Sequence, residues 1–352
     1  MTAPGDHPFA LCLTHDVDRP FKRGVHGLFY ALRGRPGYHL RTALPDRNPY
    51  WQFGEIAALE RDRGVRSAFY FLDEPHLLER PAREWASPRR WVEQLGRYEV
   101  ARPPVADVVR SLAGAGWEVG LHGSLASADD AARLAREKER LERVLGAPVL
   151  GGRQHRLRLE EPGTWRRQRG VGLRYDATLG SPTAYGFQHG YGPRRPFDDE
   201  FVVFPLTLMD QALPDPGDHP DRAWAVCESL LAEAAEHGAV MTVLWHPRLF
   251  SEADFPGHRD VYERLLDRAL AMDAWVGPPG ALYRTLVDDP PTGPAGAVPT
   301  GPGGDPAAPG VDSAPDVDRS APGADSAPDV DRSASGADPA PDVDSAASAG
   351  GE

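Results

Sequence analysis

The stretch that decides the fold is FALCLTHDVD, residues 9–18, in which a short apolar run leads directly into a group of polar residues. The apolar part is typical of a buried strand, and the polar residues at its carboxyl end are Thr14, His15, Asp16 and Asp18. Burying a carboxylate costs on the order of several kcal/mol unless a partner or a metal compensates its charge. Two acids at the end of a buried strand therefore indicate a functional site.

Further apolar segments of strand length follow, separated by segments with the apolar spacing of helices. We expect strands at 9–17, 65–72, 117–122, 149–157, 173–179, 201–208 and 239–246, and helices at 53–63, 104–115, 128–145, 162–169, 220–237 and 258–273. Ser127 and Asp130 are expected to cap the third helix, and Gly238 to end the fifth. Apolar strands that alternate with helices are typical of a parallel sheet covered by helices. About seven such units favour an α/β fold of the distorted (β/α) barrel type, with functional residues at the carboxyl ends of the strands.

The composition divides the chain into a body, residues 1–287, and a tail, residues 288–352. The tail contains 12 Asp and one Glu but only two Arg, so it carries 11 of the 13 net negative charges. Its Pro, Gly, Ala and Asp content, its degenerate 13-residue repeat and its lack of aromatic residues predict a disordered acidic segment. The body has no basic excess, which argues against nucleic-acid binding.

Other classes of protein are disfavoured by the same reading. The amino terminus shows no basic region followed by an apolar stretch, and no run approaches about 18 apolar residues. We therefore expect neither an export signal nor a membrane span, and a cytoplasmic location follows. Cys12 and Cys227 each lie in an apolar pattern and are expected to be reduced core thiols. The sequence does not indicate the oligomeric state.

Polar residues end four of the expected strands. The first strand ends in THDVD (14–18), the third in HGS (122–124), the fourth in RQH (153–155) and the seventh in WHP (245–247). Side chains alternate along a strand, so residues two apart share a face. The pairs on a shared face are Asp16 with Asp18, His122 with Ser124, and Arg153 with His155. If each pair faces inward, carboxylates, imidazoles and a guanidinium meet in one pocket.

This set of residues suits hydrolysis assisted by a divalent metal. One carboxylate and two imidazoles can hold zinc or a similar ion and leave a position for water. A second carboxylate can take the proton of an attacking water, and a histidine can protonate a leaving amine. These residue types therefore suit hydrolysis at a carbonyl carbon, with an amine as the leaving group.

The same residues resemble the motifs of the polysaccharide deacetylases, metal-dependent N-deacetylases with a distorted (β/α) barrel. Thr14-His15-Asp16 followed by Asp18 is similar to the family's first motif, Thr-Phe-Asp-Asp. The second motif resembles His122-Gly123-Ser124, the third contains Arg153, and the last resembles Leu244-Trp245-His246. The resemblance covers residues 9–287, and the combination of THDVD, GLHxS, RQH, YDxTLG and LWH is similar to a subgroup of that superfamily.

The resemblance implies roles for individual residues. Asp16 would be the general base, His246 the general acid, and Arg153 the residue that orients Asp16. Candidate substrate-binding residues are His15, Ser124, Tyr175 and Asp176; the last two precede a glycine-rich loop that either lines the cleft or is structural.

The implied metal site has one unusual feature. Asp18 and His122 would be ligands, with Asp18 taking the role because Val17 occupies the position of the family's second acid. The family's second metal-binding histidine corresponds to Ala126 in this chain. His155 is the candidate replacement in a site for a divalent metal, with zinc expected. A weaker site completed by a serine and waters, and a site without metal, are the alternatives.

We therefore expect a hydrolase that removes acetyl from an N-acetylated sugar or glycoconjugate precursor. Two other interpretations stay open: a metal-free hydrolase that opens a cyclic amide, and a barrel that binds carbohydrate without catalysis. In each case the predicted ligand is a carbohydrate or a small amide.

Overall fold

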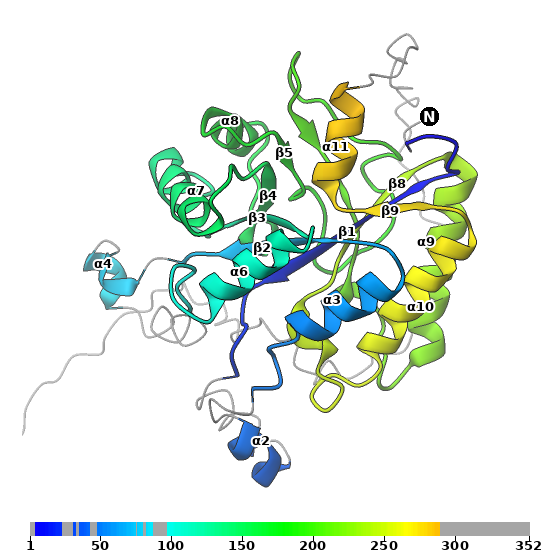
Figure 1. Ribbon diagram of the computed structural model, residues 1–352, viewed down its shortest axis with the longest axis horizontal. Helices are drawn as coiled ribbons and strands as arrows, with labels where there is room; N and C mark the ends of the chain where they lie inside the picture. Colours follow the sequence, from blue (N-terminus) through cyan, green and yellow to red (C-terminus); the bar gives the residue numbers. More distant parts are fainter. Residues whose placement is uncertain are drawn as a thin grey trace, which may run out of the picture. The chain divides into compact units, whose positions relative to one another are not determined.

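The computed structural model describes residues 4–22, 31–32, 35–42, 48–74, 76–79, 82–86 and 97–288 (Figure 1). All of them belong to one compact unit, Met1–Pro299. The tail of residues 288–352 lies outside the described residues apart from Asp288, so its disorder and its boundary stay predictions.

A curled sheet of nine strands forms the centre of the unit, with the order β6-β5-β4-β3-β2-β1-β8-β7 and with β9 paired to β1. The strands are β1 (Ala10–Val17), β2 (Ala68–Leu72), β3 (Glu118–Gly123), β4 (Gly151–Gln154), β5 (Tyr175–Asp176), β6 (Val202–Val203), β7 (Leu206–Met209), β8 (Val240–Leu244) and β9 (Trp275–Gly277). Every pair of these strands is parallel. The described strands at the two ends of the order, β6 and β7, do not pair with each other. The expected distorted α/β barrel is thereby confirmed, as an incomplete one.

The strand number differs from the expected seven for two local reasons. The predicted strand 201–208 is divided into β6 and β7 around Pro205, which has no N–H to continue a ladder. The three-residue β9 is too short to show a periodic pattern, and it pairs with Ala10, Leu11 and Cys12, leaving the later part of β1 to β2.

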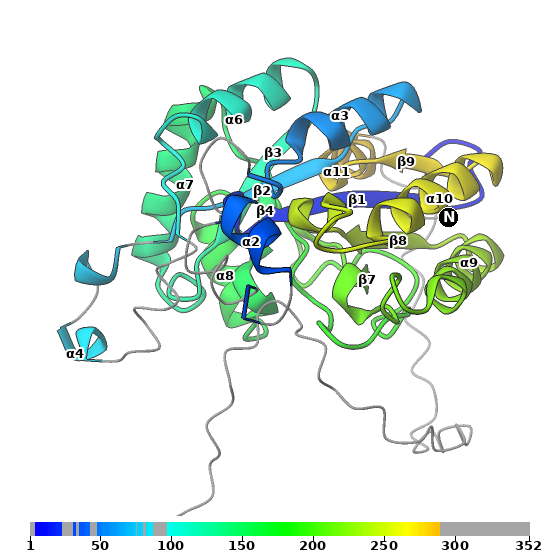
Figure 2. The same cartoon turned by 90° about the horizontal axis from the view of Figure 1, so that it is seen from below.

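Helices cover the outer side of the sheet, as seen for α3, α6, α7, α9 and α10 in two views (Figures 1 and 2). The helices are α2 (Pro36–Thr42), α3 (Phe53–Asp62), α4 (Ala82–Trp85), α6 (Val105–Gly114), α7 (Ala131–Leu145), α8 (Gly163–Gly170), α9 (Pro220–His237), α10 (His258–Ala271) and α11 (Pro279–Asp288). Short 3-10 turns follow several strands: η3 (His155–Leu157), η4 (Asp210–Ala212) and η5 (Pro247–Phe250), with η2 at Leu77–Glu79.

Helix ends follow from specific residues. Asp130 alone caps α7, its carboxylate accepting the backbone N–H of Arg133 at 3.0 Å, so the expected pairing with Ser127 is wrong. The Ser127 hydroxyl instead donates to the carbonyl oxygen of Ser124. Gly238 ends α9 in the left-handed conformation, as expected. None of the described helices is both long and apolar enough to pass through a lipid bilayer.

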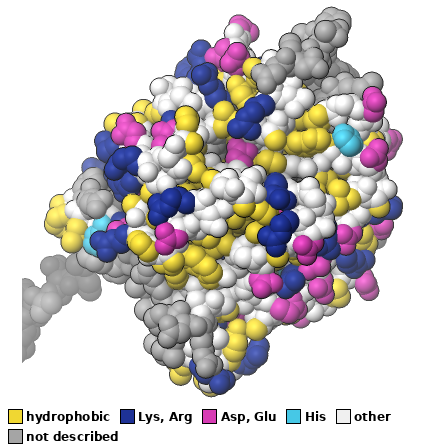
Figure 3. Space-filling view, in the orientation of Figure 1, with side chains coloured by type: hydrophobic (Ala, Val, Ile, Leu, Met, Phe, Trp, Pro, Cys, Tyr) yellow, Lys and Arg dark blue, Asp and Glu magenta, His cyan; other side chains and the backbone are white. Residues whose placement is uncertain are grey.

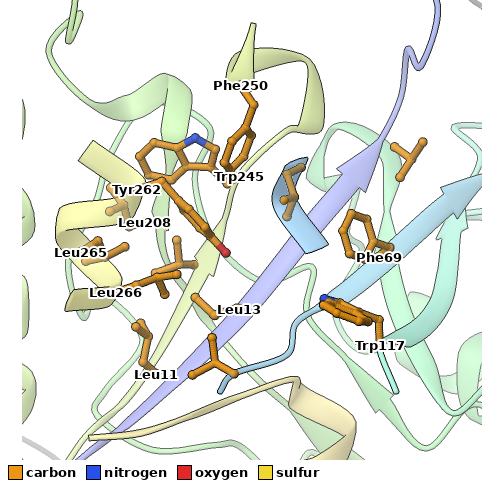
Figure 4. Close-up of a cluster of buried hydrophobic side chains, with 14 of the residues drawn as sticks. Leu11, Leu13, Phe69, Trp117, Leu208, Trp245, Phe250, Tyr262, Leu265 and Leu266 are labelled. Atoms are coloured by element: carbon orange, nitrogen blue, oxygen red, sulfur yellow. The ribbon is translucent and has the colours of Figure 1, made fainter. Parts of the chain in front are cut away.

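Two apolar clusters lie on opposite sides of the sheet. The odd-numbered residues of β1, such as Leu11 and Leu13, pack outward with Phe69, Trp117 and Tyr262 against the helices (Figure 4). The even-numbered Ala10 and Cys12 face the interior with Tyr70, Tyr175 and Leu282 of α11. This alternation of β1 therefore decides which of its polar residues reach the interior of the barrel.

The surface shows no dominant sign of charge on the face drawn in Figure 3, where acidic and basic side chains are interspersed. Such a face provides no extended basic field for a phosphate backbone.

Candidate active site

Acidic and imidazole side chains from four strand ends meet at one place, and we call Asp16, Asp18, His122, His155 and His246 the acid–histidine cluster. Asp18 is at its centre: its Oδ1 lies 3.0 Å from His122 Nε2 and 3.7 Å from His155 Nε2, and its Oδ2 lies 3.3 Å from His246 Nε2. Burial alone raises the pKa of Asp18, but His155, His122 and His246 outweigh burial and hold the pKa well below its usual range.

Three members of the cluster have the geometry of a metal site. One ligand atom each from Asp18, His122 and His155 lies within 4.8 Å of the other two. Tetrahedral zinc with bonds of about 2.0–2.2 Å holds its ligand atoms about 3.3–3.6 Å apart, and the two separations measured from Asp18 Oδ1 bracket that range. No described residue donates a hydrogen bond to this buried oxygen. The donor set and the spacing therefore fit a divalent cation.

The His122 imidazole is also oriented for such a role, and His155 has a carboxylate near its other ring nitrogen. His122 Nδ1 lies 3.0 Å from the carbonyl oxygen of Arg153, which can only accept, so Nδ1 donates and Nε2 faces Asp18. His155 Nδ1 lies 3.7 Å from Glu74 Oε2. Carboxylates and carbonyl groups behind ligand histidines commonly fix the ring orientation.

Asp16 lies beside this set and is held by Arg153. The Arg153 Nη1 donates to Asp16 Oδ1 at 2.8 Å and to the Thr14 hydroxyl at 2.9 Å, while its Nε donates to the carbonyl oxygen of Ala177 at 2.7 Å. The guanidinium also lies over the ring of Tyr70, with 5.2 Å from Cζ to the ring centroid. Asp16 Oδ2 is left 3.6 Å from His122 Nε2, on the side of the metal-site geometry.

His246 is paired with Asp210, a residue that the sequence analysis missed. His246 Nδ1 lies 2.9 Å from Asp210 Oδ2, and the same carboxylate accepts the backbone N–H of His246. Burial lowers the pKa of His246, but the Asp210 carboxylate outweighs it and raises the pKa to about 10. His246 is therefore an imidazolium at neutral pH with Nε2 directed at Asp18. The sequence did contain a signal for Asp210, because this acid directly follows the largely apolar run LTLM (206–209). The same pattern of an apolar run followed by an acid indicated a site at residues 9–18.

The structure does not bring His15 to the cluster, because residue parity turns it to the outer side of the sheet. Its Nδ1 lies 2.7 Å from the carbonyl oxygen of Trp245 and its Nε2 lies 3.0 Å from Glu60 Oε1. Glu60 is fully buried and also accepts hydrogen bonds from other donors, namely the Tyr262 and Ser67 hydroxyls and the Trp117 indole. We call these six residues, His15, Glu60, Ser67, Trp117, Trp245 and Tyr262, the Glu60 network.

The other three substrate-binding candidates are also buried, with hydrogen bonds inside the protein. Ser124 donates from its hydroxyl to Glu137 of α7 at 2.6 Å. The Tyr175 hydroxyl contacts that of Tyr70 and donates to Glu118 at 2.8 Å. Asp176 accepts hydrogen bonds from Trp165, Gln168 and Thr178. These contacts brace the strands that carry the cluster, and none of the three side chains is exposed to a substrate.

A pocket opens beside the cluster and gives a substrate access to it. Its walls include Asp18 and His155 together with Arg19, Leu72, Glu74, Arg97, Tyr98, Leu125 and Arg156. A smaller hollow is also lined by Asp18, together with Asp16, Pro247 and Arg248.

Comparison with known proteins finds similarity to solved structures at the level of the fold. No family model matches it, and no curated protein does either. A solved structure described as a polysaccharide deacetylase from Mycobacterium smegmatis has a TM-score of 0.54 and 20% identity, covering 82% of this chain and 93% of that chain. The Puue allantoinase has a TM-score of 0.53 and 16% identity, with coverage of 82% and 94%.

A third structure, described as a polysaccharide deacetylase from Pseudomonas aeruginosa PAO1, has the same TM-score of 0.53, 16% identity, and coverage of 82% and 94%. The chain therefore shares the fold of these proteins over most of its length. Membership of the subgroup with a THDVD motif stays a prediction.

Proposed function

We propose that the protein is a metal-dependent hydrolase that removes the acyl group from an N-acylated carbohydrate. The observation that carries the proposal is the convergence of two carboxylates and three imidazoles around Asp18, next to an open pocket. Two of the proteins that share the fold are described as polysaccharide deacetylases, which favours a carbohydrate substrate.

Asp18, His122 and His155 would hold the metal, with zinc as the expected ion. A bound divalent cation supplies Lewis-acid chemistry by withdrawing electron density from the carbonyl oxygen of the substrate. The low pKa of Asp18 favours this role, because a ligand carboxylate must be ionised. The replacement of the family's second histidine by Ala126 is compensated by His155 from the adjacent strand end.

Asp16 is the general base in this proposal. Arg153 occupies Asp16 Oδ1 and leaves Oδ2 to accept a proton from the water that attacks the acyl carbon. As the carbon–nitrogen bond breaks, His246 Nε2 gives its proton to the leaving nitrogen. Asp210 keeps His246 protonated for that step, since it raises the pKa of the imidazole to about 10.

The test is acetate release from N-acetylated sugars by the protein and by an Asp16→Asn variant. Loss of a general base lowers turnover about 10²–10⁴-fold. Asp129→Asn is the matched control, because Asp129 is half exposed and pairs only with Arg158 among the described residues. Undiminished acetate release by Asp16→Asn would remove Asp16 from the mechanism.

A further inference from the structure

The pocket beside the acid–histidine cluster has an excess of cationic side chains. Three guanidinium groups line it, those of Arg19, Arg97 and Arg156, against the two carboxylates of Asp18 and Glu74. Low-dielectric walls with one dominant sign of charge concentrate ligands of the opposite sign.

The two carboxylates already have partners that offset their charge. Asp18 faces His122, His155 and His246, and Glu74 Oε2 lies 3.7 Å from His155 Nδ1. Both acids therefore have imidazole neighbours at the pocket.

The arginines differ in how far they are neutralised. Arg97 contacts Glu99 at 3.1 Å and donates to the carbonyl oxygen of Glu74 at 2.6 Å, so its charge and position are fixed. Arg158, two residues after Arg156, pairs with Asp129 at 2.7 Å. Arg156 makes no ion pair or side-chain hydrogen bond to any other residue that the structure describes, and it is exposed at the pocket.

The backbone at Arg156 adopts an uncommon conformation. Arg156 has a φ of 56° and Leu157 a φ of 52°, so two consecutive residues other than glycine adopt the left-handed conformation directly after His155. Such conformations are uncommon outside glycine and gather at ligand sites, where the surrounding structure enforces them. A strained turn therefore connects a metal-ligand candidate to a guanidinium at the pocket that has no ion pair within the described part of the chain.

We propose that the pocket selects substrates that carry an anionic group, a phosphate or a carboxylate, next to the N-acyl group. Arg156 binds the anion, because a guanidinium matches the oxygens of both anions with paired hydrogen bonds. Leu72, Tyr98 and Leu125 provide the apolar wall for the uncharged part of the substrate. This inference rests on the proposed function for the identity of the scissile group.

Binding and turnover are measured separately to test it. Calorimetry on the full-length, zinc-loaded Asp16→Asn protein compares N-acetylglucosamine 1-phosphate and N-acetylmuramic acid, whose anionic groups are on the carbons beside C2, with neutral N-acetylglucosamine. We expect at least one anionic probe to bind about tenfold or more tightly than the neutral sugar, a difference that corresponds to about 1.4 kcal/mol. Adding Arg156→Gln should reduce that ratio to within about twofold, and Arg156→Lys should retain part of it.

The matched control is Arg166→Gln, since Arg166 is an exposed arginine on α8 away from the pocket, and the ratio should not change. Equal binding of anionic and neutral probes, or a preference that survives Arg156→Gln, would overturn the inference. The same probes are then given to the protein with Asp16 intact, and acetate is measured. Absence of acetate with every probe would refute the hydrolase proposal and leave the binding comparison standing.

Discussion

Replacing Glu60 by glutamine tests the Glu60 network, which lies behind the candidate active site on the outer side of the sheet. Glu60 Oε1 lies 3.0 Å from His15 Nε2 and 2.8 Å from the Tyr262 hydroxyl. Its Oε2 accepts hydrogen bonds from Ser67 at 2.8 Å and from the Trp117 indole at 2.6 Å. An amide keeps one oxygen acceptor but presents N–H groups to the other two donors.

The magnitude follows from this count of donors. A buried donor that loses its acceptor costs about 1–3 kcal/mol, so two such losses should lower the free energy of unfolding by about 2–6 kcal/mol. Denaturant unfolding of the two proteins, followed by circular dichroism, measures the difference. Glu55→Gln on the same helix is the control, because Glu55 is exposed and its ion pair with Arg259 spans 3.8 Å.

We expect the Glu55→Gln protein to stay within about 0.5 kcal/mol of the unmodified protein. If Glu60→Gln also stays within about 0.5 kcal/mol, the contacts of Glu60 do not stabilise the fold and the reasoning is refuted.

The same substitution should affect turnover without touching the pocket. His15 and Trp245, joined by a 2.7 Å contact, immediately precede Asp16 and His246. Displacing reacting groups by about 1 Å can cost about 10²-fold in rate, so we expect acetate release to fall about tenfold or more when measured without denaturant. Unchanged turnover in a destabilised Glu60→Gln protein would confine the network to a structural role.

Two further predictions concern the metal and the general acid. A chelator should abolish acetate release and added zinc should restore it; activity that survives chelation would favour the metal-free alternative. His155→Ala should weaken zinc binding about tenfold or more, as measured by calorimetry, and His189→Ala is the control that should leave it unchanged. Asp210→Asn removes the carboxylate that holds the pKa of His246 at about 10. The pKa of His246 should then fall toward or below its ordinary value of about 6.5, so turnover should drop about 10²-fold at pH 8 and less at pH 6. An unaltered pH profile of the variant would contradict this role of Asp210.

The strands that carry the cluster could be predicted because their signals are local. A buried apolar run followed by polar residues locates the ends of β1, β3, β4 and β8, and side-chain alternation puts Asp16 and Asp18 on the interior face opposite His15. Parallel strands bring such ends to one edge of a sheet, so the meeting of these residues required no long-range information.

The residues that the sequence analysis missed depend on contacts between distant segments. Glu60 lies in a helical pattern, and an acidic residue in such a pattern is usually interpreted as exposed. It is buried because α3 packs behind β1, which the sequence pattern alone does not show. Asp210 follows β7, and its pairing with His246 requires β7 to lie beside β8. Tyr175 is buried against Leu282 of α11, a long-range contact that no local pattern indicates. Its substrate-binding role stays a prediction, and its burial does not favour that role.

The position of β1 in the sheet has a consequence for biosynthesis. This earliest described strand lies between β2 and β8, and its ladder with β8 starts at the pairing of Ala10 with Val240. During synthesis, more than two hundred residues must therefore be translated after β1 before β8 is present to pair with it. This pairing is a highly non-local step of folding. Until then its apolar edge is open to pairing with other nascent chains. The acid–histidine cluster, which takes residues from the ends of β1, β3, β4 and β8, is therefore completed only after β8 has been translated.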